Sequence, residues 1–315
     1  MNNKQWFKEA EFGMMIHFGL YSLLGGEWKG KRMPGIAEWA QSYFRIPNKE
    51  YHKLTKAFNP IYFNADEWVR LAKAAGMKYI VMTSKHHEGF ALYKSDVSDF
   101  NVVDATPFNR DIIGEMAEAC QKNDLKFGLY YSQELDWSEK NGGGYTAKSP
   151  TVYGESWTND WDFDNKYKDF NICFENKIKP QVKEILTRYG DLCLIWFDTP
   201  HTITPNQSRE LCDIVKKYCP NCLINSRVGN GLGDYESSPD NDLDYKTDKY
   251  ELSEAPVTLN DTWGFKYYDD NWKDEEKIKE MRKSLNERGI NLLLNIGPDA
   301  LGRIPAPAYK ILSDF

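Results

Sequence analysis

The sequence lacks the features that mark several large classes of protein. No block of five or more basic residues occurs, and the 315 residues carry a formal net charge of −7, so we expect no nucleic-acid partner. No apolar run approaches the length of a membrane-spanning helix, so we expect no membrane partner. Residues 1–15 lack an apolar segment of signal-peptide length. This predicts a cytoplasmic location for the chain as written, and a secreted or periplasmic one if a leader has been removed.

Motifs for metals and nucleotide cofactors are also missing. The six Cys residues are scattered, and Cys219 and Cys222 form a lone C-x-x-C, whereas a zinc ribbon needs a second such pair. No G-x-G-x-x-G follows a first strand, and no Walker pattern occurs. We therefore expect no metal and no cofactor. The sequence leaves the oligomeric state open.

The chain does contain a regular alternation of helices and short, continuously apolar strands. One unit is especially clear: Asn64 and Glu67 form a capping box, Gly76 ends the helix, and the apolar segment 77–83 follows. Further helices are expected near 110–123, 166–189 (interrupted around Pro180), 205–218 and 274–287. The other expected strands are 12–20, 125–132, 191–198, 222–227 and 290–298, and 243–250 and 257–265 are candidates for two more.

This alternation predicts an α/β fold with a parallel sheet covered by helices. Eight strands in 315 residues favour a (β/α)8-like TIM barrel. No Ser/Gly-rich linker divides the chain, so residues 1–315 are expected to form a single domain. The polar stretch between 234 and 251 is interpreted as a loop after a strand.

Polar side chains end several of the predicted strands. The run "DLCLIWFD" (191–198) is apolar until Asp198, which shares parity with Leu192, Leu194 and Trp196, so one face is expected to hold all four. Catalytic groups of TIM barrels lie at the C-terminal ends of strands. The candidates there are His17, His86, His87, Tyr130, Tyr131, Asp198 and Arg227. We expect them to meet at one end of the barrel.

Two kinds of hydrolase would use such a set. A divalent-metal hydrolase could bind its ion through His17, His86, His87 and Asp198, although barrels of that kind usually carry H-x-H. Adjacent His86 and His87 should point apart in a strand and hydrogen-bond different substrate hydroxyls. A glycoside hydrolase needs a nucleophilic or basic carboxylate and an acidic one, and Asp198 suits the first role. The ten Trp, nineteen Tyr and sixteen Phe are compatible with a sugar site, because aromatic faces stack on the C–H faces of sugars.

A set of longer motifs gives a specific family resemblance. The motifs cover most of the chain: "FGMMIHFGLYS" (12–22), "AEWA" (37–40), "AKAAGMKYIVMTSKHHEGFALY" (72–93), "FGLYYSQELDW" (127–137), "LIWFD" (194–198), "INSR" (224–227), "TLNDTWGF" (258–265) and "LLLNIGPDALGRIP" (292–305). With them the sequence resembles the α-L-fucosidases of glycoside hydrolase family 29.

The resemblance implies a fold and a reaction. The fold is a (β/α)8-like barrel, often with fewer than eight outer helices. The reaction is the retaining, exo-acting hydrolysis of terminal α-L-fucosyl residues through a covalent fucosyl-enzyme intermediate. Many members add a C-terminal β-sandwich, and this chain is expected to be the catalytic domain alone. The expected substrate is a fucosylated oligosaccharide or glycoconjugate, with its linkage and aglycone left open.

The resemblance also assigns roles to individual residues. Asp198 matches the family nucleophile. The residues that match the fucose pocket are His17, Glu38, Trp39, His86, His87, Tyr131, Trp196, Arg227 and Trp263. Tyr131 is chosen over Tyr130 because it shares parity with Phe127 and Leu129.

The sequence departs from the family pattern at the general acid/base. Many relatives carry a "GDY-x-T-P-E"-like segment whose Glu serves this role, whereas this sequence has "GDYESSPD" (233–240) with one extra residue. Asp240 is therefore the predicted acid/base, Glu254 is the second candidate and Glu236 the third. A fucose-binding homologue with weakened catalysis remains as an alternative.

Overall fold

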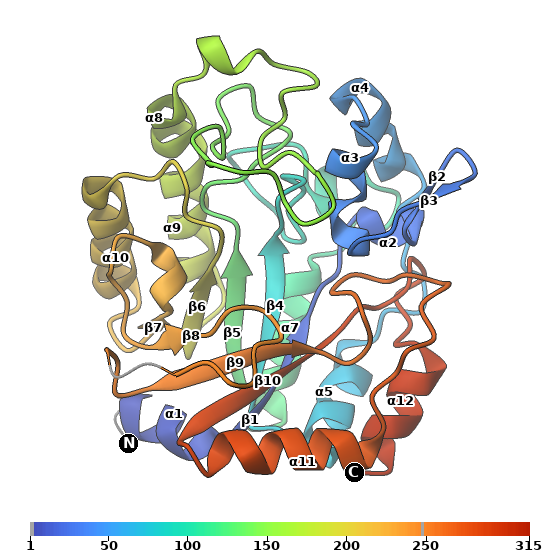
Figure 1. Ribbon diagram of the computed structural model, residues 1–315, viewed down its shortest axis with the longest axis vertical. Coiled ribbons are helices and arrows are strands. Elements are labelled where there is room, and N and C mark those ends of the chain that lie inside the picture. Colours follow the sequence, from blue (N-terminus) through green and yellow to red (C-terminus); the bar gives the residue numbers. More distant parts are fainter. Residues whose placement is uncertain (1–2, 247–248) are drawn as a thin grey trace.

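The computed structural model describes residues 3–246 and 249–315, and its main feature is a curled sheet of eight parallel strands (Figure 1). The strands are β1 (Phe12–Ile16), β4 (Tyr79–Lys85), β5 (Lys126–Tyr131), β6 (Leu194–Phe197), β7 (Leu223–Ile224), β8 (Glu236–Ser237), β9 (Ser253–Thr258) and β10 (Ile290–Ile296). Their spatial order is β7-β6-β5-β4-β1-β10-β9-β8. A parallel bridge joins Asn225, directly after β7, to Tyr235, directly before β8, and so connects the two edges. The predicted TIM-barrel-like α/β fold is confirmed.

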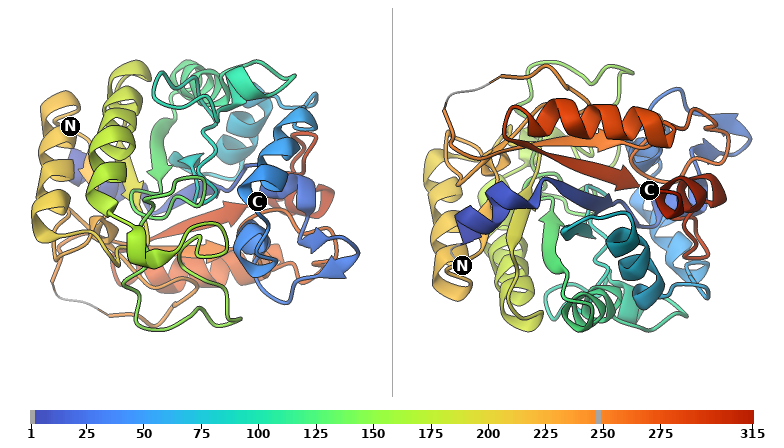
Figure 2. Two further views of the ribbon diagram at one scale, coloured as in Figure 1. Left: turned by 90° about the horizontal axis from the view of Figure 1, so that it is seen from above. Right: turned by 90° about the horizontal axis from the view of Figure 1, so that it is seen from below.

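Helices cover the outside of this barrel. The longer ones are α5 (Ala65–Ala74), α7 (Ile112–Lys122), α9 (Lys179–Arg188), α10 (Pro205–Tyr218), α11 (Glu275–Asn286) and α12 (Ala306–Ser313), and they ring the strands in Figure 2. Short helices lie in the loops: α2 (Tyr21–Leu24), α3 (Ala40–Tyr43), α4 (Asn48–Tyr51), α6 (Val102–Ala105) and α8 (Phe170–Cys173). In the described residues no α-helix separates β7 from β8 or β8 from β9, so the outer ring has fewer than eight helices.

The helix ends lie where the sequence signals predict. The Asn64 side chain accepts a hydrogen bond from Glu67 N at 3.2 Å, which caps the start of α5. Thr204 and Gln207 form a full capping box at the start of α10. The interruption expected around Pro180 is a π-helical turn over Phe174–Ile178, after which α9 begins. These local signals set the starts of α5 and α10 before any packing is considered.

Two buried layers hold the barrel together. One lies between the sheet and the outer helices, and the other fills the barrel interior. Helix α1 (Asn3–Ala10) contributes Phe7 and Ala10 to the inner layer, where they lie with Met15, Tyr79 and Leu293. Figure 1 shows α1 below the N-terminal ends of the strands. The barrel is therefore filled and is closed at that end by the N-terminal helix.

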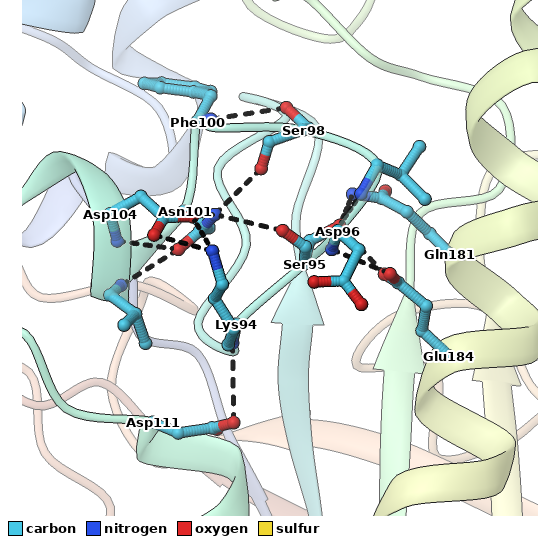
Figure 3. A network of polar contacts seen from close by, with 12 residues as sticks. Lys94, Ser95, Asp96, Ser98, Phe100, Asn101, Asp104, Asp111, Gln181 and Glu184 are labelled. Carbon is cyan, nitrogen blue, oxygen red and sulfur yellow. Dashed lines mark hydrogen bonds and ion pairs between the residues drawn. The ribbon is translucent and has the colours of Figure 1, made fainter.

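The loop after β4 is tied to the outer helix α9. Ser95 Oγ donates to Glu184 Oε2 at 2.8 Å, and Asp96 N donates to Glu184 Oε1 at 2.8 Å. Gln181 Nε2 donates to Ser95 Oγ at 3.1 Å, and Asn101 caps α6 in the same network (Figure 3). This network is on the outside of the barrel and holds two neighbouring β–α units in register.

Two strand predictions are wrong. The segment 243–250 forms no strand where it is described, and its residues Thr247 and Asp248 lie outside the described residues. The segment 257–265 is strand only over its first two residues. The last two strands before β10 are instead β8 and β9, which begin earlier in the chain. Their sequences, "ES" and "SEAPVT", are too short or too polar to show the apolar run by which the other strands were found.

No helix in the described part of the chain is long and apolar enough to cross a membrane.

Candidate active site

A cavity of about 950 Å³ opens at the C-terminal end of the barrel strands. Most of the predicted site residues line it: His17, Glu38, Trp39, His86, His87, Trp196, Asp198, Arg227, Glu236, Asp240 and Trp263. They come from the ends of β1, β4, β6, β7, β8 and β9 and from the short helical turn Ala37–Trp39. The loops that follow the strands thus bring together residues that are far apart in the sequence, as expected for this fold.

Asp198 directly follows β6 and is held by several donors. Its Oδ1 accepts hydrogen bonds from Thr199 N at 3.0 Å and from Arg227 Nη1 at 3.0 Å. Its Oδ2 accepts from Tyr130 OH at 2.9 Å, and His87 Nε2 lies 3.6 Å from the same oxygen. The side chain is 11% exposed. A carboxylate with this many donors is fixed in one orientation at the floor of the cavity and keeps little conformational freedom.

Arg227 connects two carboxylates. Nη1 binds Asp198 Oδ1 at 3.0 Å, and Nη2 binds Asp240 Oδ1 at 2.6 Å. The guanidinium carbon lies 4.5 Å from the centre of the Trp196 ring, which is a cation–π distance. Asp198 and Asp240 are therefore bound to two different nitrogens of one planar group.

Tyr130, rather than Tyr131, faces the cavity side of β5. Tyr130 pairs with Trp196 in the sheet register, and the two rings stack at 5.5 Å. Tyr131 points outward, where its OH donates to Gln181 Oε1 at 2.9 Å. The choice of Tyr131 is corrected, because both faces of this strand are buried and apolar parity alone does not say which face is inside.

The two tyrosines provide a matched pair of variants. Tyr130→Phe should lower kcat by about tenfold, since it removes one of the hydrogen bonds to Asp198, and such a bond to a charged group contributes about 1.5–3 kcal/mol. Tyr131→Phe loses a hydrogen bond on the outer face and should leave kcat within about twofold. Steady-state kinetics on an aryl fucoside measures both. Equal losses in the two variants would contradict a role for Tyr130 in holding Asp198.

The three histidines predicted for the site, His17, His86 and His87, are buried and neutral. Burial lowers the pKa of His17 to about 4, although its hydrogen bond with Asn295 opposes the shift. Burial also lowers the pKa values of His86 and His87 well below the usual range. The His86 and His87 rings lie 4.0 Å apart and both line the cavity, so the expectation that they point apart is wrong. They follow the end of β4, where strand alternation no longer applies. Neutral imidazoles can donate or accept hydrogen bonds with sugar hydroxyls.

Glu38 is a carboxyl group at the cavity wall that keeps its proton to near-neutral pH. Burial raises its pKa to about 7, although hydrogen bonds such as the one from Gly264 N at 2.9 Å work in the opposite direction. A protonated carboxyl group has an O–H to donate. Next to it, Trp39 packs edge-on against His87 with the ring centres 5.2 Å apart. Both residues are therefore in position to contact a sugar in the cavity.

Glu254 lies below the cavity, inside the barrel. Its Oε1 accepts from Trp196 Nε1 at 3.0 Å, and its Oε2 accepts from Tyr79 OH at 2.6 Å. The residue is fully buried and does not line the cavity. Glu254 holds the Trp196 indole in place through this hydrogen bond. A general acid must contact the leaving oxygen of the substrate, and Glu254 has no access to the cavity.

Glu254→Gln should change the pH dependence of folding stability. Burial raises the pKa of Glu254 from 4.5 to about 7, so folding favours its protonated form. The parent should lose stability relative to the Gln variant as pH rises from about 4.5 to about 7, by on the order of 3 kcal/mol, with no further change above that. Urea unfolding of both proteins at pH 5 and pH 8 measures the difference. Glu118→Gln, at an exposed position on α7, is the control and should show none. A constant difference between parent and Glu254→Gln would contradict the prediction.

The other two acid/base candidates lie at the cavity. Asp240 is 45% exposed and bound to Arg227. Glu236 belongs to β8, and its Oε1 accepts from Ser226 Oγ at 2.9 Å. Asp240 is therefore the one of the three candidates that shares a partner with Asp198.

No group of three or more His, Cys, Asp or Glu side chains that could hold a metal ion occurs among residues 3–246 and 249–315. The sequence alternative of a metal site built from His17, His86, His87 and Asp198 has no such ligand group in the described chain.

Comparisons with known proteins agree with this architecture. The profile of the family "Alpha-L-fucosidase" matches residues 1–315. The chain belongs to the alpha-L-fucosidase family. A solved structure of alpha-L-fucosidase AlfC from Lactobacillus casei in complex with alpha-L-fucose product is 53% identical, with a TM-score of 0.94 over 99% of this chain and 96% of that chain. Alpha-L-fucosidase isoenzyme 1 from Paenibacillus thiaminolyticus is 33% identical, with a TM-score of 0.85 over 99% of this chain and 74% of that chain.

Curated members of the fucosidase family are longer than this chain. Tissue alpha-L-fucosidase of Rattus norvegicus is 28% identical over 327 residues, which cover 95% of this chain and 64% of that protein. The putative alpha-L-fucosidase of Caenorhabditis elegans is 27% identical, and 62% of its length is covered. The chain thus spans less than two thirds of these relatives.

The sequence did not predict the outer part of the cavity. Its further lining comes mainly from the loops after β5, β6 and β8: Pro150, Thr151, Val152, Tyr153, Glu155, Trp157, Thr199, Pro200, His201, Pro239, Asn241 and Tyr245. These loops have no periodic pattern. The aromatic residues within them are the one signal in the sequence that could have drawn attention to this part of the cavity.

Proposed function

We propose that this protein is a retaining, exo-acting alpha-L-fucosidase, which hydrolyses terminal alpha-L-fucosyl residues from glycans through a covalent fucosyl-enzyme intermediate. The observation that carries the proposal is the sharing of Arg227 by Asp198 and Asp240, with contacts of 3.0 and 2.6 Å. Retaining glycosidases need two carboxyl groups only about 5–5.5 Å apart. Carboxylates bound to two nitrogens of one guanidinium fit that requirement.

Asp198 acts as the nucleophile in this proposal. Its carboxylate attacks the anomeric carbon as the bond to the leaving oxygen breaks, and a fucosyl ester forms. The donors Tyr130 and Arg227 hold it in place. The neutral histidines bind the hydroxyls of the sugar, together with Glu38, whose pKa burial raises to about 7.

Asp240 acts as the acid and then as the base. In the first step its carboxyl group gives a proton to the leaving oxygen. In the second step its carboxylate takes a proton from the water that hydrolyses the ester. Arg227 Nη2 donates to Asp240 Oδ1 at 2.6 Å and so positions this carboxyl group beside Asp198.

The substrate suggested first by the relatives is an alpha-1,6-linked fucoside. One AlfC variant, 53% identical to this chain, has been solved in complex with Fuca(1,6)GlcNAc, and another with 4-nitrophenyl-a-L-fucopyranoside. We propose that the present protein also accepts a fucosylated glycan.

An NMR time course tests the function and its stereochemistry together. The protein should release fucose from Fuca(1,6)GlcNAc, and the first anomer observed should be alpha-L-fucose, since two displacements retain configuration. Treatment with a chelator should leave the rate unchanged. Release of the beta anomer first would overturn the retaining mechanism, and a rate that follows bound zinc or manganese would favour a metal hydrolase. Absence of hydrolysis, with fucose still bound, would favour the fucose-binding homologue.

A further inference from the structure

The segment 150–157 forms an apolar outer wall of the cavity. Val152 is 93% exposed and Tyr153 is 51% exposed, yet both line the cavity. In Figure 1 the chain between β5 and α8 passes above the C-terminal ends of the strands, and the view from above in Figure 2 shows it crossing the barrel mouth. Exposed apolar side chains that gather at a cavity commonly mark a ligand-binding surface.

This wall is anchored at several points. The Trp157 ring packs against Trp39 at 5.1 Å and against His201 at 4.4 Å, and Trp157 Nε1 donates to Ser149 O at 2.8 Å. A Cβ added at Gly35 would meet Tyr153 Cδ2 at 2.7 Å, so the Tyr153 ring lies directly on that glycine. Val152 and Tyr153 therefore belong to a segment that is held in place by packing, and this packing extends to Trp39.

We propose that this wall is a subsite for the sugar ring attached to the fucosyl unit. The inference rests on the proposed function. The inner cavity carries the carboxyl groups and histidines that suit a hydroxyl-rich reacting sugar, whereas the outer wall offers Val152 and Tyr153 to the C–H face of a pyranose. A volume of about 950 Å³ is near the upper end of the range of about 300–1,000 Å³ for small-ligand sites, which leaves room for a second ring beyond a single fucose.

Two substrates distinguish the effect of losing this subsite from the effect of damaging the catalytic centre. Fuca(1,6)GlcNAc has a leaving sugar, and alpha-L-fucosyl fluoride has none. Tyr153→Ala and Val152→Ser should each lower kcat/KM for the disaccharide by about 3- to 10-fold, as loss of one apolar contact surface implies. The same variants should turn over the fluoride at the parent rate. Tyr62→Ala, which removes a tyrosine that is 56% exposed and lies outside the cavity, is the control and should affect neither substrate.

The possible outcomes show which proposal fails, the subsite or the proposed function. If the parent hydrolyses both substrates and the wall variants lose nothing on the disaccharide, or lose equally on both, the subsite is wrong and the function stands. If the parent hydrolyses neither substrate, the proposed function itself fails.

A different observation points to Gln133 as a positioning residue. Its Oε1 accepts from Asp198 N at 2.8 Å, and its Nε2 donates to Arg227 O at 3.0 Å. The side chain is fully buried. A single amide therefore joins the backbone of the proposed nucleophile to that of the arginine that pairs with it.

The next residue strengthens this connection. Glu134 accepts hydrogen bonds from the backbone N–H groups of His201 at 2.8 Å and Ile203 at 2.9 Å, and from Gly144 N at 3.0 Å. Gln133 and Glu134 thus join the loop after β5 to the loops after β6 and β7. The primary amide of Gln133 supplies an acceptor and a donor at once, which neither a carboxylate nor an ammonium group can do.

Gln133→Met, of similar length and without comparable hydrogen-bonding capacity, tests the role. It should lower kcat on alpha-L-fucosyl fluoride by about 10- to 100-fold, as misplacement of a reacting group does, with the Kd for fucose changed by less than about threefold. Gln181→Met removes a buried glutamine that accepts from Tyr131 OH and donates to Ser95 Oγ on the outer face, the second of these bonds being drawn in Figure 3. This variant should keep kcat near the parent value. Gln133→Glu keeps the acceptor and loses the donor, so its kcat should lie between the kcat of the parent and that of Gln133→Met. Equal kcat values for Gln133→Met and Gln181→Met would overturn the assignment, as would a loss confined to fucose binding.

Discussion

Asp198→Ala is expected to lower kcat by roughly three to five orders of magnitude while the fold persists, because the covalent route is removed. The side chain is 11% exposed and lines the cavity, so its loss should leave the packing of the barrel intact. Added azide should partly restore turnover of an activated fucoside and give the beta-fucosyl azide, since a small anion can enter the space of the missing carboxylate and attack directly.

Asp191→Ala is the matched control for this experiment. Asp191 is exposed and precedes β6, whereas Asp198 follows it, so the two residues flank the same strand at opposite ends. The control should keep the parent kcat and should not respond to azide. Near-normal activity of Asp198→Ala, or formation of an alpha-fucosyl azide by the variant, would contradict the nucleophile assignment.

Asp240→Ala is expected to slow hydrolysis of Fuca(1,6)GlcNAc by about 10²- to 10⁴-fold, the usual contribution of a general acid. Fucosides of acidic phenols should be affected much less in the first step, because such leaving groups depart without a proton. Breakdown of the fucosyl-enzyme should also slow, since the same residue must act as base toward water. A series of aryl fucosides with increasing phenol pKa measures this dependence.

Two further variants make the test comparative. Glu236→Ala removes the third candidate from the cavity wall, and Glu254→Gln removes the charge of the second candidate beneath Trp196. Neither should acquire the strong dependence on the leaving group. If Glu236→Ala acquires it and Asp240→Ala does not, Glu236 is the acid/base, and Asp240 serves only as a partner of Arg227.

The sequence predicted the parts of the fold that depend on local signals. The pair Asn64 and Glu67 located the start of α5. Apolar runs located the strands β1, β4, β5, β6, β7 and β10. β8 and β9 were missed because their pairing is set by neighbours in the barrel: Ser253 lies opposite both Glu236 and Ile290. These contacts cannot be predicted from the short sequences "ES" and "SEAPVT" alone.

The candidate site could also be predicted only in part from the sequence. The residues at the strand ends were found because a barrel collects them at one mouth, and Asp198 and Arg227 lie in contact there. The sequence could not show that Tyr130 faces the barrel interior, because a strand that is buried on both sides has no polar face to orient it. Leu192 likewise packs in the outer layer while Leu194 and Trp196 face inward, because the alternation does not extend back beyond the start of β6 at Leu194.

The closure of the barrel by α1 makes the cavity a blind pocket. Phe7 and Ala10 fill the far end, so the described residues leave no passage through the barrel, and we expect a glycan to insert a chain end from the mouth. In the proposed reaction the released sugar must leave by the route through which it came, and the water that frees fucose must enter behind it. The order of departure, aglycone first and fucose second, is thus imposed by the shape of the molecule as well as by its chemistry.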